Sequence, residues 1–158
     1  MSEFNKYFDV AIKEAKKAFD KAEVPVGCVI VDKNTGKVIS KAYNKTELYL
    51  NSLMHAEIIA ITKASKKLGK NLSDCIAFVT LPPCIMCATA FTYARIDNVY
   101  YCTKRTKIDC NDDCKNIYKL DKSLYKTNFH FISNEFTKIS ENLLKNFFHN
   151  LRSNKNFI

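Results

Sequence analysis

The fold is decided by residues 75–87, whose sequence is CIAFVTLPPCIMC. The apolar run from Cys75 to Leu81 predicts a buried strand. Pro82 and Pro83 cannot continue that strand, because proline has no N–H group to donate to the hydrogen-bond ladder. Proline is favoured in the first turn of a helix, so we expect a helix from about Cys84 to Ala94. The stretch therefore predicts a strand, a sharp break and a helix.

The segments on either side extend this pattern. Downstream, Asn98 to Cys102 (NVYYC) predicts another strand. A helix between two strands most simply joins them as parallel neighbours, because parallel strands need a long crossover that is usually helical. Upstream, His55 to Leu68 predicts a helix that ends at Gly69. Its apolar residues are Ile58, Ile59, Ile61 and Leu68.

The N-terminal part of the chain predicts a helix and a hairpin. Phe4 to Ala22 carries apolar residues at helical spacing with lysines between them, which is typical of an amphipathic helix. Val26 to Asp32 and Lys37 to Tyr43 are short apolar-rich runs separated by the turn sequence Lys-Asn-Thr-Gly. They predict the first two strands, joined as a hairpin. The polar segment from Asn44 to Leu53 is expected to be a loop.

The C-terminal part is less regular. Thr103 to Lys126 is charged and predicts irregular structure, Phe129 to Ile132 predicts a last short strand, and Glu135 to Arg152 predicts a helix. The apolar stripe of that helix is expected to pack on the core and comprises Phe136, Ile139, Leu143, Phe147 and Leu151. Together the elements predict an α/β protein, a three-layer α/β/α sandwich around a central mixed sheet of about five strands.

Composition indicates a folded globular protein. A length of 158 residues is usual for one domain, and we expect that domain to span residues 1–158. Hydrophobic residues make up 47% and charged residues 26%, which argues against a disordered chain or an integral membrane protein. The first residues place charges among the apolar positions and predict neither a signal peptide nor a membrane span. A cytoplasmic location is therefore expected.

Charge and glycine content bear on the partners of the protein. The net charge of +9 would attract polyanions, of which nucleic acid is the commonest in the cytosol. The excess comes from 22 lysines beside three arginines, so a solvated lysine coat explains it equally well. With only three glycines the chain has no glycine-rich phosphate loop, which argues against nucleoside triphosphate chemistry.

The cysteines indicate metal binding more than disulfides. There are seven, an odd number, in a chain with no export signal, so reduced thiols and metal ligands are the better interpretation. Cys84 and Cys87 stand three residues apart at the start of a predicted helix and can bind one zinc ion together. Such a pair also occurs in redox sites and in structural zinc sites. His55 is the one obvious third ligand, and three ligands leave one coordination position open for water.

Glu57 follows the histidine by two residues and predicts a different role. Residues two apart on a helix do not share a face, so Glu57 is expected to move protons rather than to bind the metal beside His55. His55 and Cys84 both begin predicted helices, where the helix dipole favours thiolate over thiol. Two thiolates weaken the ability of zinc to acidify water, which makes a nearby base more valuable. Glu57 is the predicted catalytic acid and base.

The remaining cysteines and histidines predict no second site. Cys28, Cys75 and Cys102 lie in or beside predicted strands, where cysteine usually behaves as a small apolar residue. His130 and His149 are expected to be ordinary surface or core residues. Cys110 and Cys114 lie among acidic residues in the irregular segment 103–126, and a second metal there is a minor alternative.

These motifs resemble the cytidine deaminase superfamily, in which histidine and two cysteines bind zinc and a glutamate transfers protons. Within it the chain is most similar to the bacterial tRNA adenosine deaminase branch, over nearly its whole length. The matching pieces, in order, are Glu23-Val24-Pro25-Val26-Gly27, Tyr43-Asn44, His55-Ala56-Glu57-Ile58, Val79-Thr80-Leu81, Pro83-Cys84-Ile85-Met86-Cys87 and Phe147-Phe148. The resemblance implies a cytidine-deaminase-like fold, one Zn²⁺ per chain and a homodimer that converts adenosine to inosine at the wobble position of a tRNA anticodon loop.

The resemblance also implies a set of substrate-binding residues. Asn44 would hydrogen-bond the flipped base and Val26 would help to wall its pocket. Ala56, and the backbone near Pro83 and Cys84, would complete the base site. Extruding a base costs least in a single-stranded loop, which suits an anticodon target.

Two other functions stay open from the sequence. One is a free-base or nucleoside deaminase of the same fold, such as a guanine or cytosine deaminase, because the stretch Ala64 to Gly69 is similar to the guanine enzymes. The other is a noncatalytic tRNA-binding subunit, or a degenerate fold that keeps zinc for structure. The intact Glu57 argues against the tRNA-binding subunit, because a binding module has no need of a proton shuttle.

Overall fold

The computed structural model describes residues 3–104 and 127–154. Within these ranges the chain forms four helices and a five-stranded sheet, and the predicted elements are present close to their expected bounds. The elements are α1 (Asn5–Asp20), β1 (Gly27–Asp32), β2 (Val38–Tyr43), α2 (Ala56–Leu68), β3 (Cys75–Val79), α3 (Ile85–Tyr93), β4 (Asn98–Tyr101), β5 (Asn128–Phe131) and α5 (Glu135–Asn154). The predicted irregular segment lies outside the described residues from 105 onward, and Cys110 and Cys114 lie there too.

The sheet is mixed, as predicted, and has the strand order β2-β1-β3-β4-β5. β1 pairs antiparallel with both β2 and β3, whereas β3, β4 and β5 run parallel. The parallel pair β3 and β4, joined through α3, confirms the predicted crossover. The pairings Gly27 with Tyr43, Cys28 with Val79 and Val79 with Tyr101 bring the start of β1 and the ends of β2, β3 and β4 together. We call this the carboxyl edge of the sheet.

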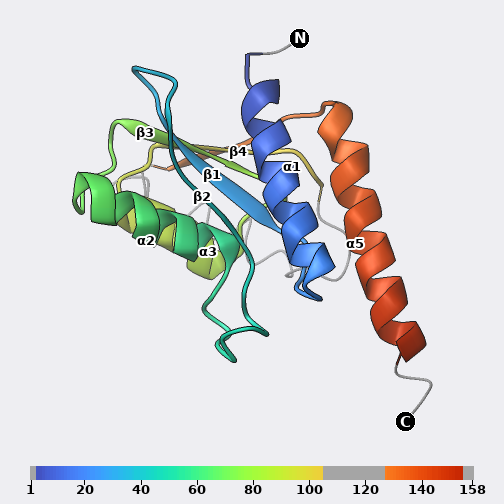
Figure 1. Ribbon diagram of the computed structural model, residues 1–158. Coiled ribbons are helices and arrows are strands. Elements are labelled where there is room, and N and C mark those ends of the chain that lie inside the picture. Colours follow the sequence, from blue (N-terminus) through green and yellow to red (C-terminus); the bar gives the residue numbers. More distant parts are fainter. Residues whose placement is uncertain (1–2, 105–126, 155–158) are drawn as a thin grey trace.

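Helices cover both faces of the sheet. Figure 1 shows α1 and α5 side by side on one face and α2 and α3 on the other, which gives the three predicted layers. The α1 face is filled by large aromatic side chains, with ring centroids of Phe8 and Phe78 5.4 Å apart and those of Phe4 and Tyr100 4.6 Å apart. The α2 face is filled mostly by small residues, among them Ala60, Ala64 and Ala77.

The packing face of α2 is formed by small residues and Glu57 rather than by its largest apolar residues. Its fully buried residues are Ala56, Glu57, Ala60 and Ala64, whereas its isoleucines are only partly buried and Leu68 is exposed. The physical reason is the distance between helix and sheet. Alanine lets the backbone approach closely, and the Ser40 hydroxyl on β2 donates a 2.7 Å hydrogen bond to the carbonyl of Ala60. Larger side chains are displaced to the flanks.

The predicted stripe of α5 is also partly wrong. Phe136, Ser140, Leu144 and Phe147 form its buried face, while Ile139 and Leu151 are exposed. These buried positions follow the helical period, but a serine breaks the apolar pattern that the sequence analysis followed. Ser140 is tolerated because its hydroxyl donates to the carbonyl of Thr80 at 3.3 Å.

Candidate functional site

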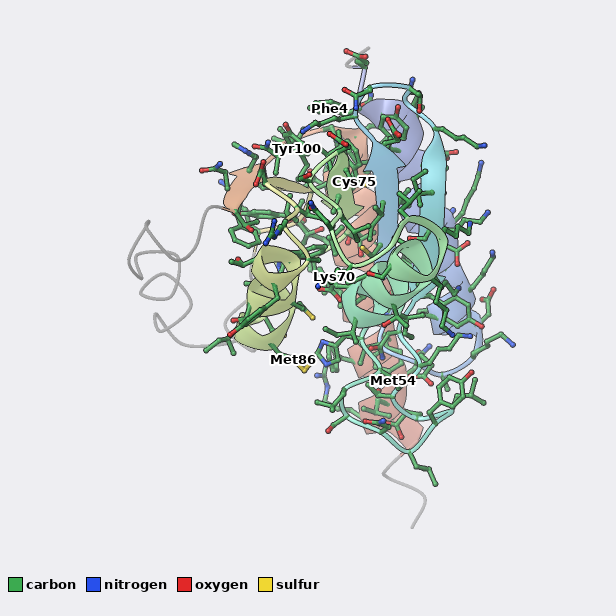
Figure 2. All side chains as sticks on the ribbon, turned by 90° about the vertical axis from the view of Figure 1, so that its left-hand side faces the viewer. Phe4, Met54, Lys70, Cys75, Met86 and Tyr100 are labelled. Atoms are coloured by element: carbon green, nitrogen blue, oxygen red, sulfur yellow. The ribbon has the colours of Figure 1, made fainter. Side chains whose placement is uncertain are left out.

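The predicted metal ligands come together where α2 and α3 begin. His55 and Cys84 are the N-cap residues of these two helices, and both have extended backbone conformations. Cys87 lies in the first turn of α3 and is buried. Figure 2 labels Met54, which precedes His55, and Met86, which lies between the two cysteines; both are at the same end of the two helices. The strand-break-helix sequence 75–87 thus carries the cysteines to the carboxyl edge.

The three ligand atoms fit a zinc ion. Nδ1 of His55 lies 3.7 Å from Sγ of Cys84 and 3.5 Å from Sγ of Cys87. A tetrahedral zinc with bonds of about 2.3 Å to sulfur and about 2.0 Å to nitrogen requires a nitrogen to sulfur separation of about 3.5 Å. His55, Cys84 and Cys87 form the one group of this kind among the described residues, with all ligand atoms within 4.8 Å of one another. The donors are positioned to bind a metal ion.

Hydrogen bonds within this group move the pKa values of its members. The Cys87 thiol, helped by His55, stabilises the Cys84 thiolate and lowers the pKa of Cys84 to about 4. The same shared hydrogen bond, with burial, raises the pKa of Cys87. The bond to Cys84 also raises the pKa of His55. These hydrogen bonds favour the Cys84 thiolate in addition to the helix N-terminus, which Cys84 occupies as the sequence predicted.

Glu57 lies beside the ligands without joining them. It is the second residue of α2 and is 4% exposed, and its Oε2 atom is buried with no hydrogen-bond partner in the described part of the chain. Burial raises the pKa of Glu57 to about 6, and the charges of Cys84 and His55 also act on it. An unpaired buried carboxylate oxygen is costly, so its presence here indicates a site that holds a polar group during function.

The residues implied to bind substrate line the same edge. Asn44 follows β2 and donates its N–H to the carbonyl of Val26, which precedes β1, at 3.2 Å. The next residue, Lys45, donates to the carbonyl of Met54 at 2.9 Å, so the chain segments at Asn44 and His55 run together. Ala56 and Pro83 are buried beside the ligand residues His55 and Cys84. The structure brings these residues to one end of the sheet; their contacts with a base stay predictions.

A pocket opens next to the metal ligands. It has a volume of about 430 Å³. Its walls are Thr46, Glu47, Leu50, Asn51 and Ser52 of the loop between β2 and α2, together with His55. Figure 1 shows this loop projecting beyond the carboxyl edge of the sheet. His55 is the one metal ligand among the residues that line the pocket.

Sequence reasoning missed one residue of this region, Glu23. It is 1% exposed, and its carboxylate accepts hydrogen bonds from the side chain of Asn44 and from the loop. The residue lies in the matched motif Glu23 to Gly27, but nothing in its spacing identified a contact with residues more than twenty positions away. The one signal in the sequence was a glutamate placed among apolar residues, between Ala22 and Val24.

The other described thiols lie in the core, and the other two histidines lie at or near the surface, as the sequence predicted. Cys28, Cys75 and Cys102 are buried, and all five described cysteines are free. His130, on β5, stacks on Tyr100 with ring centroids 4.9 Å apart and makes a 2.9 Å hydrogen bond to Asn98. His149 is exposed on α5. None of the helices in the described ranges has the length and apolarity to span a membrane.

Comparison with known proteins gives consistent matches. Residues 1–103 match the family model described as the cytidine and deoxycytidylate deaminase zinc-binding region. A protein of Rickettsia bellii named tRNA-specific adenosine deaminase is 41% identical over 143 residues, which cover 90% of this chain and 97% of the relative. All four residues of the predicted catalytic and metal site fall within the range of the family model.

Solved structures extend the likeness to three dimensions. One comes from structural studies of A-to-I editing by tRNA:A34 deaminases at the wobble position of transfer RNA. It has a TM-score of 0.76 and 30% identity, covering 89% of this chain and 99% of that chain. A guanine deaminase from Bacillus subtilis has a TM-score of 0.62 and 27% identity, covering 100% of this chain and 96% of the other. The fold is therefore that of cytidine-deaminase-like proteins, as the resemblance implied.

Proposed function

Since the chain belongs to the cytidine and deoxycytidylate deaminase family, we propose that it is a zinc-dependent hydrolase that converts adenosine to inosine at the wobble position of a tRNA. The observation that carries the hydrolytic part is the ligand group of His55, Cys84 and Cys87 with a buried, unpaired Glu57 oxygen beside it. The tRNA part is supported by relatives of nearly equal length that are named for this reaction.

In the proposed reaction the carbon that bears the amino group of adenine gains an oxygen from water and loses ammonia. His55, Cys84 and Cys87 hold the zinc ion, which when bound supplies Lewis acidity that makes a water molecule easier to deprotonate. Glu57 accepts a proton from the attacking water and donates it to the adjacent ring nitrogen. Glu57 then accepts the second proton, from the hydroxyl group now attached to this carbon, and donates it to the amino group, which leaves as ammonia while the carbon becomes a carbonyl. Water and substrate thus become inosine and ammonia, and Glu57 ends as it began.

The base site is assigned to four residues around this centre. Asn44 offers both a donor and an acceptor for the edge of the base. Val26, which is partly buried, is assigned to the wall of the base site, and Ala56 and Pro83 are assigned to its border next to His55 and Cys84. The loop from Thr46 to Ser52 then lies where the nucleotides beside the target base would pass.

We further propose a cytoplasmic homodimer. α2 and α3 both carry exposed apolar side chains, with exposed fractions of 49% for Leu68, 48% for Ile85 and 80% for Tyr93. Contact with a second copy of the chain would remove such apolar surface from water. Light scattering of the purified protein tests the dimer, since a monomer mass at micromolar concentration would contradict it.

The substrate is tested by a side-by-side assay. Purified protein is given an anticodon stem-loop with adenosine at the wobble position, and separately guanine, cytosine and adenine; inosine and ammonia are measured. We expect inosine in the stem-loop and little ammonia from the free bases. The guanine deaminase similarity makes guanine the informative competitor. Turnover of guanine alone would replace the tRNA assignment with the free-base one.

Salt and metal provide two further readouts. Phosphate contacts make RNA binding fall steeply with salt, whereas a small neutral base is hardly affected, so KM for the stem-loop should rise with ionic strength. Elemental analysis should find about one zinc per chain, as three protein ligands predict a single tightly held ion. Protein that is free of zinc and gains none on addition would contradict the metal site.

A further inference from the structure

We infer that Glu23 is a positioning residue that holds both Asn44 and the loop from Thr46 to Ser52 in the shape that receives the substrate. This inference rests on the proposed function, because it concerns the same base site. Glu23 does not line the pocket next to His55. It acts through residues that do.

Both carboxylate oxygens of Glu23 accept hydrogen bonds from Asn44 or from the loop. Oε1 accepts the N–H of Leu48 at 2.7 Å, and Oε2 accepts the N–H of Glu47 at 3.1 Å. Oε2 also accepts the hydroxyl of Thr46 at 3.3 Å and the side-chain amide of Asn44 at 3.2 Å. Four donors converge on one buried side chain, and hydrogen bonds to a charged acceptor are about twice as strong as neutral ones.

The position of Glu23 itself is fixed by the end of α1. Its N–H donates to the carbonyl of Ala18 at 2.9 Å, so the residue is bonded to the last turn of the helix. Ala22, just before it, has a φ of 57°, a left-handed conformation that turns the chain back toward the sheet. A non-glycine residue held there implies that the surroundings determine the turn. Glu23 therefore connects the end of α1 to the loop from Thr46 to Ser52.

The contact with Asn44 sets the direction of its side-chain amide. Nδ2 donates both to Glu23 and to the hydroxyl of Thr46, each at 3.2 Å. A carboxylate can only accept, so the opposite orientation of the amide would place Oδ1 against another acceptor. Oδ1 is the atom of this amide for which the described residues supply no partner. Glu23 thus decides which end of Asn44 is available to a base.

The contact with the loop sets the wall of the pocket. The backbone N–H groups of Glu47 and Leu48 donate to the Glu23 carboxylate. Thr46 and Glu47 line the pocket together with His55. Hydrogen bonds within the loop connect these residues to the other lining residues; for example, the N–H of Asn51 donates to the carbonyl of Thr46 at 3.0 Å. Pre-ordering a loop before the ligand arrives reduces the entropy lost on binding.

The test compares E23Q with a matched buried acid. Glutamine keeps the size of Glu23 but presents an amide nitrogen to N–H donors. Glu14 on α1 is also buried, at 4% exposure, and it contacts Lys17 and Lys41 instead of the site. E14Q is therefore the control for loss of a buried carboxylate. T46V, which removes one hydroxyl, is the milder variant in case E23Q folds poorly.

Kinetics on zinc-loaded full-length protein separate positioning from folding. Losing hydrogen bonds to a charged group costs about 10- to 100-fold in an equilibrium constant, so kcat/KM of E23Q should fall by about that factor, mainly through KM. T46V should shift KM in the same direction by less, and E14Q should leave it unchanged. A fall in kcat at constant KM, in parallel with lost zinc or lost folded protein, would mean a merely structural role and overturn the inference.

A second measurement does not depend on the reaction. Hydrogen exchange of the Glu47 and Leu48 amides should be at least about tenfold faster in E23Q than in wild type and E14Q, because these are the amides that Glu23 anchors. Unchanged exchange would contradict the inference whatever the substrate is. The kinetic comparison is run on whichever of the stem-loop, guanine or cytosine the wild type turns over. Failure of the tRNA assignment therefore remains distinguishable from failure of the Glu23 assignment.

Discussion

The two faces of the sheet bury different kinds of residue. Between α1 and the strands lie aromatic rings in direct contact, and Phe78 of β3 touches Phe4, Tyr7, Phe8 and Tyr100. Between α2 and the strands lie alanines, Cys28, and the carboxylate of Glu57. Both faces bury a carboxylate, but that of Glu14 on α1 is bonded to Lys17, whereas Oε2 of Glu57 on α2 has no partner among the described residues. An unpaired buried oxygen beside a group of metal ligands fits a carboxylate that acts on a ligand.

This contrast teaches where stability and chemistry reside in the molecule. Large rings on one face supply burial in quantity, since each aromatic side chain removes a large apolar area from water. Small residues on the other face keep α2 and α3 close to the strands, so that the ligands at the two helix starts meet across the carboxyl edge. Changes on the α1 face should therefore affect folding, and changes at the start of α2 should affect turnover.

The largest expected effect is that of E57Q on turnover. The variant keeps the shape of Glu57 but cannot accept or return a proton, and general acid–base catalysis contributes about 10²- to 10⁴-fold to rate. We expect kcat to fall by at least that factor, with zinc content and melting temperature close to wild type. Single-turnover assays and elemental analysis on the same preparation check this. Deamination at a near-normal rate would remove Glu57 from its assigned role.

The next largest effect is expected on the opposite face, for F78A. Removing a fully buried phenylalanine leaves a cavity and typically costs about 3–5 kcal/mol of the free energy of unfolding. The molecules that remain folded should bind zinc and turn over substrate normally. Denaturant unfolding measures the loss, and activity per zinc-loaded chain measures the site. F78L, which keeps most of the volume, should be milder; a large loss of activity per folded molecule would break the separation between the faces.

Sequence alone predicted more of the site than of its support. The ligands His55, Cys84 and Cys87 could be predicted because metal binding restricts both residue type and spacing. The strand order could not, since neither the antiparallel pairing of β1 with β3 nor the placement of β5 beside β4 leaves a local pattern. The buried face of α5 was also predicted only in part. Ser140 lies on that face because its hydroxyl donates a hydrogen bond to the carbonyl of Thr80, and an apolar pattern does not reveal such a position.

The sequence did not predict which polar residues are buried. Glu23 and Glu57 are both inside the protein, yet glutamate is among the residues least often buried. The role of Glu57 was predicted from its neighbour His55, whereas Glu23 has its partners in a distant loop and was missed. A residue whose function depends on contacts across the fold is visible only when the fold is.

A third prediction concerns Gly27, which lies against α1 and also at the carboxyl edge of the sheet. A Cβ atom added there would lie 1.9 Å from the carbonyl oxygen of Ala11 on α1, so α1 must move away in G27A. Overpacking of this kind costs about 1–3 kcal/mol of unfolding free energy. Gly27 also bonds Thr80 through both its N–H and its carbonyl, at 3.1 and 3.0 Å, so the carboxyl edge should shift as well.

G27A should therefore reduce both the stability of the fold and the binding of substrate. We expect a lower melting temperature and, in the folded fraction, a higher KM for the substrate. Thermal unfolding and steady-state kinetics measure the two effects. Normal KM in destabilised protein would show that α1 is displaced without disturbing the site edge, and would sharpen the separation between the faces.

The smallest expected effect is that of C28A, which tests whether proximity to the site is enough for function. Cys28 is fully buried on β1, and burial together with the charge of Glu57 raises the pKa of its thiol. It is not among the residues positioned to bind the metal. A neutral thiol in a packed core contributes as a small apolar group, so its loss should cost about 1 kcal/mol of unfolding free energy. Zinc content and kcat should stay unchanged, whereas C87A should lose the metal. If C28A also lost zinc, the set of three ligands would be incomplete, and the open coordination position on which the reaction depends would be filled by sulfur.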